Sequence, residues 1–169
     1  MAQSVHAFAV WLSNTPLSLL IQNVSWIIPT VQTIHILSIA IVMSSVFMLH
    51  LRIIGPMGRG QPLAAVARRF LPWIWCTLVV LLLSGTTLII GEPGRSLQNP
   101  AFLAKMSMLI AVVLLTLFFQ RGLRRDALFW DSSAGRRASA RLIAVVSLLL
   151  WVGILFAGRW IAYMTDTSA

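Results

Sequence analysis

Four long apolar runs dominate the hydrophobic pattern of this chain. Each is close to the roughly 20 residues that an α-helix needs to cross a bilayer, and charged residues are almost absent inside them. The runs cover about 26–49, 70–90, 101–119 and 142–163. The pattern therefore predicts an all-α membrane protein folded as a four-transmembrane-helix bundle.

Prolines lie near the predicted starts of these helices. Pro29, Pro72 and Pro100 fall in first turns, where the missing backbone N–H costs no hydrogen bond. Asn99 directly before Pro100 is typical of a helix N-cap. We expect no proline deep inside a span, and therefore four uninterrupted helices.

A shorter apolar segment, 5–22, precedes the first run. It is interrupted by Asn14-Thr15-Pro16, a cap followed by a first helical residue, and neither piece, 5–13 or 16–22, is long enough to cross a bilayer. We predict an amphipathic helix-turn-helix that lies in the membrane interface. Residues 1–169 would then form a single integral membrane domain.

Composition and charge support a membrane protein and suggest its orientation. Only 10% of the 169 residues are charged, against roughly 25% in an average soluble domain. Of the 13 Lys and Arg, four lie between the first and second runs and six between the third and fourth, ten in all. The positive-inside rule places these loops in the cytoplasm and both termini in the periplasm of a bacterial inner membrane. The net charge of +9 is then explained by this topology and by the attraction of the positive loops to anionic lipid head groups. We therefore expect no nucleic-acid partner.

Polar residues line one face of the first predicted span. Ionisable groups inside a membrane are costly and mark function by default, so we expect this face to point into the bundle. His35 would lie about a third of the way in from the outer side and His50 at the inner boundary, where we expect it to be hydrated. The residues on this face form a polar stripe, and Ser44 points away from it. The stripe consists of Gln32, His35, Ser38, Ser45 and His50.

Two cations near the outer side share their depth with His35. They are Lys105, one turn after Pro100, and Arg159. With His35 and Gln32 they form the predicted cofactor-binding set, which would suit haem propionates, a quinone head group or an anionic lipid. Alternatively, both cations extend to the outer head groups of the membrane.

The two histidines of the first span resemble those of membrane b-type cytochromes, in which two imidazoles hold each haem iron. Here the third histidine, His6, lies outside the spans, so a membrane-buried pair within one chain is excluded. His35 as a haem b ligand would need a methionine, an open sixth position, or a haem shared between chains. The alternative is a structural histidine bonded to a neighbouring helix. The candidate methionines are Met106, Met108 and Met164.

Four stretches resemble an uncharacterised bacterial family of four-span inner-membrane proteins of similar length. They are PTVQTIHIL at 29–37, LRIIG at 51–55, NPAFLAKM at 99–106 and AGRWIAY at 157–163. The resemblance covers nearly the whole chain and implies fold and compartment without an activity. In outline the chain is also similar to copper-resistance membrane proteins and b-type cytochromes, which is an analogy of shape.

The sequence contains no catalytic triad, metal-binding motif or phosphate-binding glycine loop, so it does not indicate an enzyme. The one cysteine, Cys76, is expected to be a small buried hydrophobic residue. Our first hypothesis is a small subunit of a larger redox-linked membrane complex, either non-catalytic or carrying haem. The alternatives are a free-standing protein that binds or transports a small molecule or lipid, and a purely structural bundle. Expected partners are the bilayer and other membrane subunits or a second copy of the chain.

Overall fold

The computed structural model describes residues 2–55, 60–97 and 99–164, and all regular structure in these ranges is helical. Two short helices come first, followed by two long ones, a single turn, and two more long ones. In chain order they are α1 (Ala2–Ser13), α2 (Pro16–Asn23), α3 (Ile27–Ile54), α4 (Leu63–Gly91), α5 (Pro93–Leu97), α6 (Pro100–Arg125) and α7 (Ala134–Met164).

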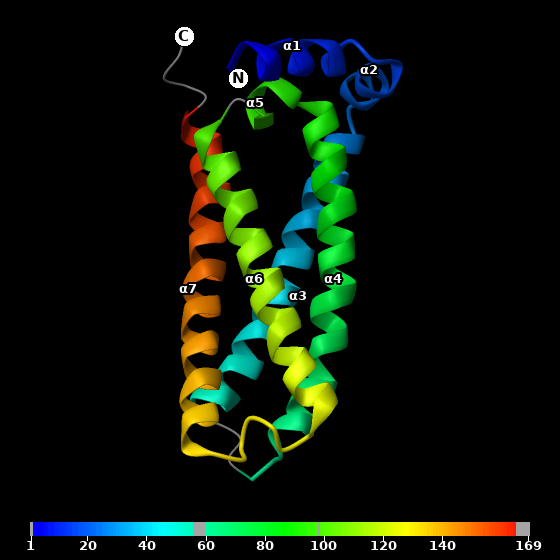
Figure 1. Ribbon diagram of the computed structural model, residues 1–169. Coiled ribbons are helices and arrows are strands. Elements are labelled where there is room, and N and C mark those ends of the chain that lie inside the picture. The colour runs from blue at the N-terminus through cyan, green and yellow to red at the C-terminus, as the bar shows by residue number, and fades with distance from the viewer. Residues whose placement is uncertain (1, 56–59, 98, 165–169) are drawn as a thin grey trace.

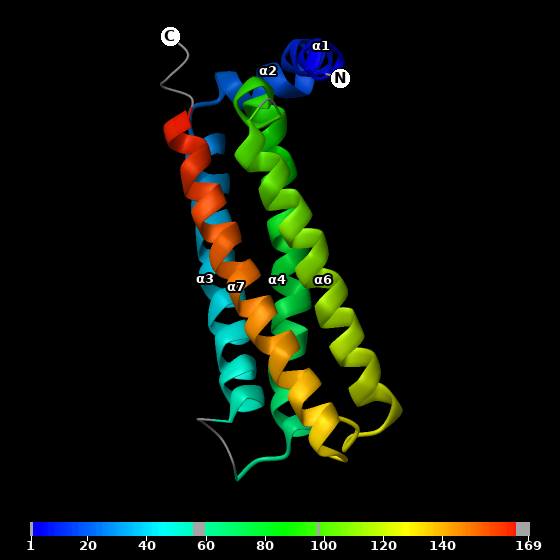
Figure 2. The same ribbon diagram turned by 60° about the vertical axis from the view of Figure 1, so that its left-hand side comes forward.

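The four long helices, α3, α4, α6 and α7, are each long and apolar enough to span a membrane. They run antiparallel along one bundle, with α1, α2 and α5 across one end (Figure 1). Packing is most extensive within the pairs α3–α4 and α6–α7, and α3 joins the pairs through α7 (Figure 2). The predicted four-helix membrane bundle is confirmed, and the chain is a multi-pass membrane protein.

The long helices extend beyond the apolar runs that predicted them. Pro72 was expected in a first turn, but this is wrong because α4 already begins at Leu63, which leaves Pro72 inside the helix. The added turns are held by the burial of Leu63, Val66 and Ala67 in the core. At the start of α6 the prediction is confirmed, since the Asn99 side chain accepts a hydrogen bond of 2.9 Å from the Ala101 N–H.

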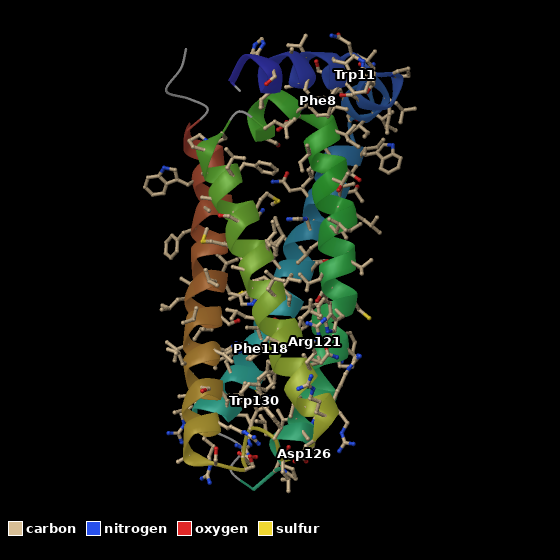
Figure 3. The ribbon with its side chains drawn as sticks, viewed as in Figure 1. Phe8, Trp11, Phe118, Arg121, Asp126 and Trp130 are labelled. Carbon is tan, nitrogen blue, oxygen red and sulfur yellow. The ribbon has the colours of Figure 1, made fainter. Side chains whose placement is uncertain are left out.

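The predicted N-terminal helix-turn-helix is also present. Helices α1 and α2 meet at an angle of 64°, and Thr15 caps α2 by accepting a hydrogen bond from the Ser18 N–H. The fully buried Ser18 hydroxyl in turn donates to the Ile90 carbonyl at 2.6 Å. This bond satisfies one of the last carbonyls of α4 and fixes α2 to the end of the bundle. Phe8 and Trp11 remain exposed on α1 (Figure 3).

We call the opposite end of the bundle the arginine-rich end. It carries the α3–α4 and α6–α7 connections, and ten of the 13 Lys and Arg of the sequence lie between the apolar runs that these connections join. Trp130, labelled in Figure 3, closes this end. It is 3% exposed, stacks on Phe119 with ring centroids 5.5 Å apart, and donates its indole N–H to the Phe119 carbonyl at 3.0 Å. The indole lies directly against Gly122 of α6, where an added Cβ would be 2.8 Å from Nε1. Only glycine at position 122 leaves room for this packing.

Gly122→Ala is expected to lower the free energy of unfolding by about 1–3 kcal/mol, because the new methyl group must displace Trp130 or Phe129 from a packed site. The change can be measured as the midpoint of thermal unfolding of the purified protein in detergent. Gly135→Ala is the matched control, since no atom lies within 4 Å of the added Cβ, and it should leave the midpoint unchanged or slightly raised. Equal losses in the two variants would contradict this account of Trp130.

Candidate functional site

His35 lies on α3 in the half of the bundle nearer α1 and α2, and is partly buried. Its Nδ1 atom is 2.8 Å from the hydroxyl of Ser84 on α4. That hydroxyl is also 2.7 Å from the Val80 carbonyl, which can only accept a hydrogen bond. Because a serine has a single hydroxyl proton, we infer that Ser84 donates it to Val80 and that the His35 Nδ1–H donates to Ser84. In this arrangement the lone pair of the imidazole is on Nε2.

Gly85 allows α4 to approach this imidazole closely. A Cβ at position 85 would lie 3.4 Å from Cε1 of His35, at the short end of an ordinary van der Waals contact. Serine and glycine at adjacent positions of α4 therefore supply the hydrogen-bond partner and a close contact for the ring. Neither residue was among the predicted site residues. The available signal was a Ser-Gly pair inside an otherwise apolar run.

Lys105 on α6 is a second ionisable residue in the same half of the bundle. It lies close to the start of α6 at Pro100 and is partly buried. Nζ of Lys105 would lie 3.7 Å from a Cβ at Gly158 of α7. We define the His35 site as His35, Ser84, Gly85, Lys105 and Gly158.

The structure does not bring all four predicted site residues together. Gln32 and Arg159 are exposed, whereas His35 and Lys105 are partly buried. The expectation that Gln32 faces the interior is wrong, because it lies at the edge of the stripe and is exposed. The remainder of the stripe behaves as predicted: Ser38 and Ser45 are buried and Ser44 is exposed.

Two further expectations from the sequence are wrong. His50 was expected to be hydrated, but it is 7% exposed and its Nδ1 donates to the Val46 carbonyl at 2.6 Å. Since α3 continues to Ile54, His50 still lies inside the bundle. Cys76 was expected to be buried but is exposed on α4, because a span that is apolar on all sides does not reveal which side faces the other helices.

The methionines considered as iron ligands have the following positions. Met108 packs against Gly153 of α7, where an added Cβ would be 2.8 Å from the sulfur. Met106 is partly buried on α6. The side chain of Met164 lies outside the described residues. Within the described part of the chain, no group of three or more His, Cys, Asp or Glu could hold a metal ion.

Comparison with known proteins identifies a family for this chain but no activity. No curated protein and no solved structure matches the chain. A family model does match, over residues 8–164, which include all of α2 through α7. The chain therefore belongs to the family of unknown function DUF6644.

Proposed function

We propose that this membrane protein binds the polar head group of a small membrane-soluble molecule at the His35 site, as a subunit of a redox-linked complex in the bacterial inner membrane. The observation that carries the proposal is a His35 imidazole fixed by its hydrogen bond to Ser84, with the partly buried Lys105 in the same half of an apolar bundle. Such groups are costly inside a span and are retained where they bind or conduct something. A role in binding follows from the chemistry of these two side chains.

The two side chains define which head group fits. The Lys105 ammonium can only donate hydrogen bonds, whereas Nε2 of His35 can accept one. A matching ligand therefore carries both an acceptor and a donor, together with a tail that is soluble in the membrane. A quinol head group meets both requirements, because one hydroxyl can donate to His35 and the oxygen of the other can accept from Lys105. We infer a quinol as the ligand class, which links the site to redox chemistry.

Orientation follows from the distribution of charge. We infer that the arginine-rich end faces the cytoplasm by the positive-inside rule, which places both chain termini and the His35 site toward the periplasm. The bundle presents large apolar side chains outward, among them Leu82, Leu149 and Phe156. This surface suits lipid, other membrane subunits or a second copy of the chain.

A second candidate function is haem b binding with His35 as an iron ligand. It is favoured by the same hydrogen bond to Ser84, because metal-bound histidines commonly donate their second ring N–H to a fixed partner. A free-standing transporter or a purely structural bundle has no comparable support.

His35→Ala and Lys105→Met are each expected to weaken quinol binding about 10-fold or more, or about 1.4 kcal/mol, because each removes one of the two polar contacts. Binding of a short-chain quinol can be followed by titration calorimetry on the protein in lipid nanodiscs. Ser44→Ala is the control, since Ser44 is on the same helix but exposed. Binding that is unchanged in both site variants would rule out this site.

Haem binding can be tested separately by the reduced-minus-oxidised absorption spectrum of the purified protein. The quinol proposal predicts no haem b band in this spectrum. A band in the parent protein that disappears in His35→Ala would replace the quinol proposal with the haem function. A band that persists in His35→Ala would exclude His35 as the iron ligand.

The location of the site predicts unequal effects of two arginine substitutions. Arg159→Ala, next to Gly158 of the His35 site, should weaken quinol binding by about twofold or more, because it removes hydrogen-bond donors beside the site. Arg137→Ala, near the other end of α7, should leave quinol binding unchanged. The same nanodisc titration measures both variants. Equal effects would argue against a site at the His35 end.

A further inference from the structure

A second polar feature, far from the His35 site, lies at the arginine-rich end. It is a pocket of about 180 Å³ between the end of α3, the start of α4 and the first turns of α7. Three arginines line it, one from α3 and two from α7. They are Arg52, Arg137 and Arg141.

Parts of this pocket are held in place by the fold. The Arg52 guanidinium donates two hydrogen bonds to the Gln61 carbonyl, of 2.9 Å from Nε and 2.6 Å from Nη2. Arg141 lies over Gly55, so that an added Cβ there would be 3.9 Å from Nη2 of Arg141. Gly55 has a φ of 101°, which disfavours any other residue at the end of α3. The buried ring of Trp130 forms one wall.

The charge of the pocket selects for an anion. Three guanidinium groups face a single carboxylate, that of Asp131, so the lining is positive overall. Leu63, the first residue of α4, also lines the pocket. The first N–H groups of a helix have no partner within the helix and attract anions.

The size of the pocket and its arginines suit a phosphate group. Guanidinium groups bind phosphate with paired, charge-assisted hydrogen bonds. Since one water occupies about 30 Å³ of liquid volume, the pocket has room for a phosphate group and a few waters. We propose that this pocket binds a phosphate group, supplied either by the head group of an anionic phospholipid or by free phosphate in the adjoining aqueous phase.

The proposal goes beyond the general attraction of positive loops to a membrane surface. Arg124 and Arg125 are at the same end, exposed on the last turn of α6, and do not line the pocket. If only the net charge of this end mattered, these arginines would count as much as those of the pocket. Matched pairs of substitutions can therefore separate a site from a charged surface.

The test compares Arg137→Gln/Arg141→Gln with Arg124→Gln/Arg125→Gln, which remove the same charge. In one arm, inorganic phosphate is titrated against protein in phosphatidylcholine nanodiscs. In the other arm, binding of phosphatidylglycerol to detergent-purified protein is measured by native mass spectrometry. We expect the pocket variant to weaken binding about 10-fold or more and the control variant to stay within about twofold.

Each outcome bears on the proposal. Saturable phosphate binding in nanodiscs identifies the free anion as the source, and phosphatidylglycerol binding without it identifies a lipid head group. Equal losses in the two double variants, or no binding in either arm, would overturn the phosphate site. If the pocket variant does not fold, the single substitution Arg137→Gln at an exposed residue replaces it. This substitution is expected to weaken binding about threefold or more, and an unchanged affinity would also overturn the phosphate site.

Discussion

Water is scarce in the middle of a membrane bundle, so each polar side chain there needs a partner within the protein. Most hydroxyls of this bundle meet the requirement by bonding back to their own helix, as Ser38 does to the Ile34 carbonyl. His35 is different because its partner, Ser84, is on another helix. This one bond joins α3 to α4, orients the imidazole and leaves one ring nitrogen available. The candidate function depends on that orientation.

Glycines lie where helices contact key side chains at both ends of the bundle. Gly122 admits the indole of Trp130, while Gly85 and Gly158 bring α4 and α7 into contact distance of His35 and Lys105. At the His35 end, a histidine and a lysine lie partly buried among apolar helices. At the arginine-rich end, the packing of Trp130 closes a pocket lined by guanidinium groups. The two ends therefore suit different ligands.

Features set by local sequence could be predicted, and those set by contacts between helices could not. The four spans follow from their apolar length, and the cap by Thr15 before Pro16 follows from residue type. The true start of α4 depends on burial of Leu63 against the core, which no local pattern shows.

The same distinction between local sequence and contacts between helices applies to the residues of the candidate site. His35 and Lys105 could be predicted because ionisable residues are rare in spans. Ser84 and Gly85 could not, because α4 is apolar on nearly all sides and its periodicity does not mark the inner face. Gln32 was expected beside His35 on helical geometry alone, which does not tell how wide a face of α3 the neighbouring helices cover.

The protonation pattern of the His35 ring tests the central claim most directly. It can be read from ¹⁵N chemical shifts of the imidazole nitrogens in protein labelled at histidine, with His35→Ala used to assign the signal. Our account predicts a proton on Nδ1 and a lone pair on Nε2, because the hydroxyl proton of Ser84 is donated to Val80. A proton found on Nε2 would contradict it, because His35 would then have no acceptor to offer a ligand.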